Sequence, residues 1–151
     1  MTWSNRQKQS AFVLILVILG IGYMSLKSNP DSPEAAIEAA IDAMIEGAEA
    51  KDIDPFEDHV SPSFRDESNR PKDDVLRIVR AIFLRHPTIA ISKVNLDITS
   101  TTNPAVYDAR LLVLTGEGLL PKDKAEFYLT FRQEQGRWLL WQAQWGDGYG
   151  Y

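Results

Sequence analysis

The chain has 151 residues, of which 44% are hydrophobic and 25% charged, a balance typical of a globular protein and not of a disordered tail. Its formal net charge is −5, but residues 1–27 carry +3 and no acidic side chain, which leaves −8 for the remainder. Because so acidic a remainder repels phosphate backbones, we expect no nucleic-acid partner. The absence of cysteine excludes thiol catalysis, disulfides and thiolate metal sites.

A long uncharged segment lies near the N-terminus, between Lys8 and Lys27. Its eighteen residues would cover roughly 27 Å as a helix, close to the ~30 Å hydrocarbon core of a bilayer. We predict a transmembrane helix over residues 11–26, between a cytoplasmic N-terminus (1–10) and a tether (27–32). Positive charge on the leading side is expected to keep the N-terminus in the cytoplasm of a bacterium and the domain in its periplasm, at the inner membrane.

A cleaved secretory signal is the main alternative for this segment, because it shares the charged start and the apolar middle. Its cleavage site needs small residues at a fixed spacing after the apolar run. Ser25 to Pro30 contain no such A-x-A pattern, so a retained anchor is favoured.

The domain predicted over residues 33–146 begins with helical signals. Ser32, Pro33 and Glu34 have the order of an N-cap, a first-turn proline and an acidic residue, and they predict a helix to about Ala50. A short helical turn is predicted from Asp54 through Val60. Ser61–Arg70 are interpreted as polar connecting chain. A third helix is expected to begin at Pro71 and to end before Pro87.

Four strands are predicted after the helices, because β-branched and aromatic residues dominate runs that are separated by turn signals. These runs are Ile89–Thr99, Ala105–Thr115, Ala125–Glu134 and Arg137–Trp145. Their short connections favour antiparallel hairpins. We therefore expect an α+β fold in which three helices pack on a curved four-stranded antiparallel sheet, followed by a flexible tail over residues 147–151.

The last predicted strand is apolar on both sides. Simple alternation places Trp138 and Leu140 on one side, and Leu139, Trp141 and Trp145 on the other. The second apolar side needs a cover, so Trp138, Trp141 and Trp145 are candidate interface residues.

Three segments carry a resemblance to a known superfamily: PEAAIEAAIDAMIEGAEAKD, HVSPSFRDE and GRWLLWQAQW. Together with the order of elements, they resemble the nuclear transport factor 2-like superfamily over residues ~33–146. The resemblance implies an internal pocket between sheet and helices and frequent dimerisation through the outer sheet face. Candidate pocket residues are Met44, Phe64, Phe83, Asp108, Tyr128 and Trp141.

Residues that could carry chemistry are few. Superfamily isomerases use a pocket tyrosine and two acids, but the first helix here has no tyrosine. Asp52 and Asp54 are favoured as turn and helix-cap residues, and Asp108 with Arg110 as part of a cross-strand polar face beside Tyr128 and Arg132. The two histidines, His59 and His86, are too far apart in sequence for a helical metal pair. We predict no catalytic set, no cofactor and no metal site.

Two functions remain open. The favoured one is a membrane-anchored interaction or assembly domain that forms a homodimer or binds another protein. The alternative is a pocket protein that binds or converts a small apolar molecule, as an isomerase or cyclase does. A filled interior favours the first function, and an open cavity with Asp108 or Tyr128 pointing inward favours the second.

Overall fold

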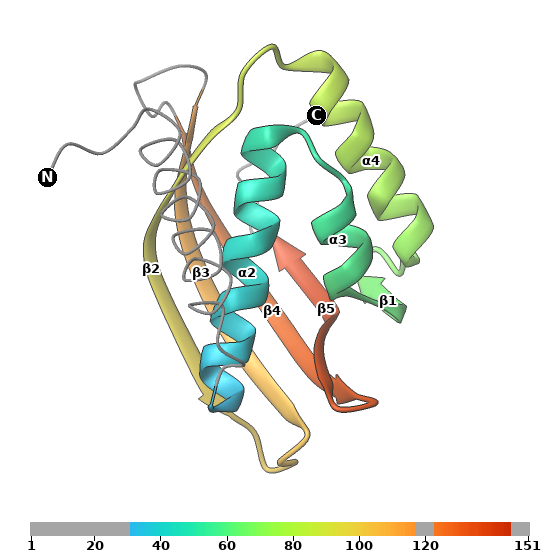
Figure 1. Cartoon of the computed structure of the whole chain (residues 1–151), viewed down its shortest axis with the longest axis vertical. Helices are drawn as coiled ribbons and strands as arrows, with labels where there is room; N and C mark the ends of the chain where they lie inside the picture. The colour runs from blue at the N-terminus through green and yellow to red at the C-terminus, as the bar shows by residue number, and fades with distance from the viewer. Residues whose placement is uncertain (1–30, 117–122, 146–151) are drawn as a thin grey trace, which may run out of the picture. The chain divides into compact units, whose positions relative to one another are not determined.

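The computed structural model of the chain describes residues 31–116 and 123–145, which belong to one compact unit. Its helices are α2 (Pro33–Ala50), α3 (Asp54–His59) and α4 (Lys72–Arg85). Its strands are β1 (Val60–Asp66), β2 (Ala90–Ser100), β3 (Val106–Gly116), β4 (Asp123–Glu134) and β5 (Arg137–Trp145). Figure 1 shows the helices in front of the sheet, with α2 crossing its face and α4 beside β1. The predicted α+β class is confirmed.

Helix α2 begins and ends as the sequence predicts. The Ser32 hydroxyl accepts a hydrogen bond from the backbone N–H of Ala35 at 3.1 Å, which satisfies one of the free donors at the helix start. At the other end, Lys51 adopts a left-handed conformation with φ 55° and closes the helix. The chain then turns so tightly that a Cβ on Gly47 would lie 2.9 Å from Cγ of Pro55, which explains a glycine at this contact of α2 with α3.

The sheet has five strands in the described part of the chain, in the order β1-β5-β4-β3-β2. Four of them, β2 to β5, form the predicted antiparallel meander. The prediction of four strands is wrong because it left out β1, which pairs in parallel with β5 at the edge of the sheet. The segment 61–70 is therefore not plain connecting chain, and Val60 begins β1 instead of ending a helix.

Strand β1 is hard to recognise because few of its side chains are apolar. Only Val60 and Phe64 are buried hydrophobic residues, while Ser61 and Asp66 are buried polar ones. Its pairing shifts register between Val60 and Arg65, around the strand proline Pro62. Proline cannot donate to a ladder and is confined to edges and bulges, so an edge position with an irregular register suits this segment.

The core lies between α2 and the sheet. Ile37 and Ile41 of α2 are 0% and 1% exposed, and they pack in one cluster with Phe64 and Phe131, which are 1% and 0% exposed. Large side chains therefore fill the space between helices and sheet. Burial of each such side chain contributes about 1.5–3 kcal/mol relative to leaving it in water.

Helix α2 also covers the free edge of the sheet at β2. Lys93 donates hydrogen bonds to Glu38 at 2.8 Å and to Asp42 at 2.7 Å, both on α2. Glu49 accepts a hydrogen bond from the backbone N–H of Ile91 at 2.9 Å. Charged side chains from the helix thus occupy an edge strand that would otherwise offer its backbone groups to another chain.

The transmembrane helix predicted over residues 11–26 and the tail 147–151 lie outside the described residues. Among the helices that are described, none is long and apolar enough to cross a membrane.

Candidate functional site

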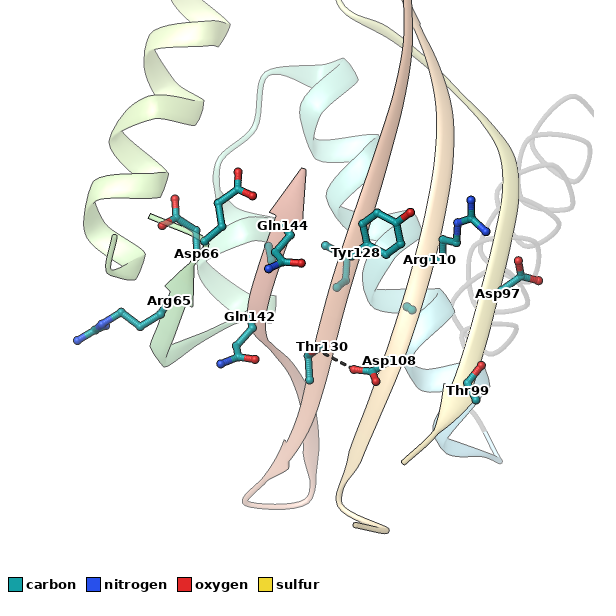
Figure 2. A pocket seen from close by; sticks show the side chains of 14 residues that line it. Arg65, Asp66, Asp97, Thr99, Asp108, Arg110, Tyr128, Thr130, Gln142 and Gln144 are labelled. Atoms are coloured by element: carbon teal, nitrogen blue, oxygen red, sulfur yellow. Dashed lines mark hydrogen bonds between the residues drawn. The ribbon is translucent and has the colours of Figure 1, made fainter. Parts of the chain in front are cut away.

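The sheet face turned away from α2, here called the outer face, carries a hollow of about 640 Å³ that is lined by five strands or their immediate continuations. Its polar side chains alternate with Ala109, Leu129 and Ala143, which belong to the core cluster. Figure 2 shows these polar side chains on one side of the sheet, with α2 behind the strands. We call this feature the polar hollow.

Strand register arranges the polar hollow into two rows that run across the sheet. The first row is Asp97, Arg110, Tyr128 and Gln144, and the second is Thr99, Asp108, Thr130, Gln142 and Arg65. Neighbours within a row are cross-strand partners, so their side chains lie side by side. The rows bring together residues that are up to 79 positions apart in the sequence, from 65 to 144.

Contacts within the rows hold several of these side chains in place. Thr130 Oγ1 donates a hydrogen bond to Asp108 Oδ1 at 2.8 Å. The Arg110 guanidinium lies 5.8 Å from the centroid of the Tyr128 ring, and its Nε donates to Glu126 at 2.5 Å. The hydrogen bond to Glu126 raises the pKa of Arg110, so this cation keeps its charge at every working pH.

The chemistry of the polar hollow favours binding over proton transfer. A general base must be free to take a proton from the substrate, but Asp97 and Asp108 are exposed to water, and the buried Asp66 is already bound to Arg70 and two backbone N–H groups. Within the described residues, no group of three or more His, Cys, Asp or Glu side chains is arranged to hold a metal ion. Thr130, Tyr128 and Gln142 instead offer hydroxyl and amide groups that both donate and accept hydrogen bonds.

The six candidate pocket residues fall on two sides of the sheet. Met44, Phe64 and Phe83 are buried on the helical side, with 8%, 1% and 9% of their surface exposed. Asp108 and Tyr128 line the polar hollow on the outer face and do not point into the interior. Trp141 lies on the outer face as well, since the Arg132 guanidinium stacks 4.4 Å from its ring centroid.

The three candidate interface tryptophans are divided in the same way. Trp138 packs against the core and meets the Tyr107 ring edge-on, with centroids 5.1 Å apart. Trp145 also packs against the core, with the Arg70 guanidinium 5.5 Å from its ring centroid. Trp141 does not share this side of the sheet with Trp138 and Trp145, because it stacks with Arg132 on the outer face.

A β-bulge causes this division and corrects the predicted sides of β5. The ladder passes from Thr130↔Gln142 directly to Phe131↔Leu140, so Trp141 has no partner on β4. The extra residue reverses the alternation beyond it, and Trp145 returns to the side of Leu140. The expectation that Trp145 shares a side with Trp141 is therefore wrong.

The other candidate residues have local structural roles. Asp52 Oδ1 accepts a hydrogen bond from the backbone N–H of Asp54 at 3.0 Å, at the start of α3. His59 is the last residue of α3, where burial and then the positive charge of Arg137 lower its pKa. His86 is the C-cap residue that follows α4, and its backbone N–H donates to the Ile82 carbonyl.

Five residues of the polar hollow were not predicted as site residues: Asp97, Thr99, Gln142, Gln144 and Arg65. Each is polar and lies on a strand or at an irregular register, so nothing in its own sequence context marks it. A correct pairing register of the four antiparallel strands could have identified Asp97, Thr99, Gln142 and Gln144. It would have required the positions of the bulges in β2 and β5.

No protein-family model matches the sequence, and no curated protein matches it. Solved structures do resemble the chain. An NTF2-like protein of unknown function from Pseudomonas putida KT2440 aligns with a TM-score of 0.65 and 13% identity, over 79% of this chain and 90% of its own. A proposed dehydratase of the NTF2-like family from Streptomyces avermitilis aligns with a TM-score of 0.62 and 15% identity, over 78% and 97%.

A third solved structure, a proposed aromatic ring hydroxylase from Novosphingobium aromaticivorans, aligns with a TM-score of 0.62 and 14% identity. The alignment covers 73% of this chain and 85% of that one. At these identities the likeness concerns the fold alone. The described domain has the nuclear transport factor 2-like fold, with three helices packed on a curved sheet of five strands.

Proposed function

We propose that the chain is a membrane-anchored, extracytoplasmic assembly domain without a catalytic set, and that it self-associates through the outer face of its sheet. The observation that carries the proposal is the stacked pair of Arg132 and Trp141, here called the aromatic corner. Tryptophan and arginine are the residue types most often found at energetic centres of protein interfaces. Both side chains are only partly covered by the domain itself.

The carboxylate of Glu134 fixes the position of Arg132 in the aromatic corner. Glu134 accepts hydrogen bonds from Arg132 at 2.6 and 3.0 Å and from the buried hydroxyl of Ser61 at 2.8 Å. Burial alone would raise the pKa of Glu134, but the hydrogen bonds from Ser61 and Arg132 lower it, so the carboxylate stays charged. A pre-organised contact loses little side-chain entropy when a partner binds.

The membrane anchor in this proposal rests on the sequence. Residues 11–26 are nearly all apolar, and the uncharged stretch around them is long enough to span a bilayer. With Arg6 and Lys8 on the leading side, the N-terminus stays in the cytoplasm and the domain lies in the periplasm, at the inner membrane of a bacterium. The anchor would concentrate copies of the domain in two dimensions, which favours self-association.

A second candidate function is the binding or conversion of a small molecule in an internal pocket. Its support comes from the likeness of the fold to that of other proteins. The similar structures include a proposed dehydratase and a proposed aromatic ring hydroxylase. In this chain, however, Phe64 and Phe131 are buried in the core between helices and sheet, and Asp108 and Tyr128 point outward. Packing therefore supports the assembly function over the pocket.

Light scattering tests the proposed self-association. Residues 29–151 are expected to form a dimer or a larger assembly, and Trp141→Glu is expected to convert it to a folded monomer. Gln133→Glu adds the same charge at an exposed site on β4 and is the matched control, because it lies outside the aromatic corner. A wild-type monomer at high concentration, or an assembly that survives Trp141→Glu, would refute the proposal.

The anchor is tested separately with the full chain in bacterial cells. We expect the whole chain to stay with the membrane after alkaline extraction and to be digested by protease from the periplasmic side only. A soluble chain that has lost its first thirty or so residues would instead establish a cleaved secretory signal.

A further inference from the structure

We propose that the polar hollow binds a saccharide chain. The proposal goes beyond assembly, because none of the residues that line the hollow belongs to the aromatic corner. It requires that the outer face over the two rows, from β2 across to β5, stays open to solvent when copies associate through the aromatic corner. Three features of the hollow support a saccharide ligand: unused hydrogen-bonding groups, an exposed aromatic ring and the balance of charge.

Hydrogen-bonding groups in the hollow are left unused by the domain. The side chains of Thr99, Gln142 and Gln144 make no hydrogen bond to any other described residue. Each carries at least one donor and one acceptor, as does every hydroxyl group of a sugar. Asp108 and Asp97 add carboxylate oxygens, which accept strong hydrogen bonds from hydroxyl donors.

The spacing of these groups suits a ligand that carries many hydroxyls along a chain. Adjacent strands lie roughly 5 Å apart, and successive side chains on one face of a strand are roughly 7 Å apart. The two rows therefore form a grid whose steps are comparable to the width of a sugar ring. The residues that line the hollow come from every strand of the described sheet, so a chain of several rings fits better than one compact molecule.

An aromatic ring lies in the middle of this grid. Tyr128 is 45% exposed, although it is one of the large hydrophobic residues of the domain. Cross-strand partners flank it on both sides, Arg110 on β3 and Gln144 on β5. The Arg110 guanidinium lies over one face of this ring, and the exposed part of the ring can meet the C–H groups of a sugar while the neighbours bind the sugar's hydroxyls.

The charge of the hollow argues against other occupants. Asp97, Asp108 and Glu67 are exposed carboxylates, and they outnumber the two arginines of the hollow, Arg65 and Arg110. An anionic ligand such as a phosphate would therefore be repelled. The two rows contain no aliphatic side chain, whereas the centre of a protein interface is usually apolar and poor in charge.

Calorimetric titration of the full chain tests the proposal, with the protein in phosphatidylcholine nanodiscs so that no sugar headgroup competes. The probes are triacetylchitotriose and maltotriose. We expect at least one probe to bind with a dissociation constant of about 1 mM or tighter, as expected for a few exposed hydrogen bonds and one stacked ring. Gln142→Ala and Tyr128→Ala should each weaken binding at least tenfold, whereas Tyr128→Phe, which keeps the ring, should not.

Gln133→Ala is the matched control, since it removes an exposed glutamine outside the hollow, and it should bind the probe like the wild type. Failure of both probes, or equal binding by Gln142→Ala and wild type, would overturn the proposal. The oligomeric state of Gln142→Ala separates this result from the assembly function. If that variant dissociates the assembly, a second copy occupies the hollow and the saccharide proposal is wrong.

Discussion

The β-bulge at Trp141 makes single-residue deletions in β5 a sharp test of the structure. Deletion of Trp141 removes the one residue without a partner on β4, so Leu140, Ala143 and Trp145 keep their inward positions. The deletion abolishes the stack of Trp141 on Arg132, which is worth about 0.5–1 kcal/mol at a partly exposed site. We expect this shortened chain to fold.

Deletion of Ala143, only two residues further on, should be far more damaging. It turns Gln144 inward and Trp145 outward, or, if the strand absorbs the bulge, it turns Gln142 inward. In both cases a glutamine amide is buried without a hydrogen-bond partner, which lowers the free energy of unfolding by about 1–3 kcal/mol. Loss of the Trp145 packing adds about 1.5–3 kcal/mol in the first case. In the first case the total approaches the whole stability of a marginal domain, about 5 kcal/mol.

Urea unfolding of residues 29–151, followed by circular dichroism, measures both deletions. The midpoint should fall slightly for the Trp141 deletion and much further for the Ala143 deletion, which should be nearly unfolded in buffer if Trp145 turns outward. If the two chains lose similar amounts of stability, the bulge is not located at Trp141 and the division of the tryptophans is mistaken.

Three further predictions concern the interior and its charges. Phe131→Ala should lower the free energy of unfolding by about 3–5 kcal/mol in urea, because this ring is 0% exposed; a loss below 1 kcal/mol would contradict its central place in the core. Asp66→Ala should cost about 3–5 kcal/mol, since the carboxylate binds Arg70 Nε at 2.5 Å and two backbone N–H groups, and Asp66→Asn should recover part of that loss. Burial and Arg137 lower the pKa of His59, so the unfolded chain binds its proton more readily and stability should fall as pH drops below about 6.5. Thermal unfolding between pH 7.5 and 5.5 should show a smaller fall for His59→Gln, and an equal fall would show that His59 does not contribute.

Local signals in the sequence were sufficient for most of the fold. The N-cap at Ser32 and the apolar stripe of α2 predict a helix whose bounds agree with Pro33–Ala50. Alternation of large apolar and polar residues predicts β3 and β4, which are regular and pair with neighbours in sequence. Strand β1 was missed because its partner, β5, lies far along the chain and its burial depends on polar residues such as Ser61.

The outer face was only partly predictable, for a different reason. Alternation on the regular strands correctly places Asp108 and Arg110 on one polar face with Tyr128. On β2 and β5 a bulge inserts one residue, and the same rule then assigns every residue beyond the bulge to the wrong side. Bulge positions depend on pairing across the sheet, so no pattern within one strand reveals them.

The contacts of α2 with β2 have a consequence for how the domain can assemble. Lys93 and Glu49 occupy the long outer edge of the sheet, and a bulge at Val94 interrupts its regular spacing. An incoming strand would have to break these contacts before it could extend the ladder. If copies associate as proposed, their contacts would be directed to faces of the sheet, where a two-fold arrangement closes on itself, and away from the edge, where head-to-tail pairing would grow into filaments. In the proposed assembly, the acidic residues of α2 would thus limit its size without taking part in it.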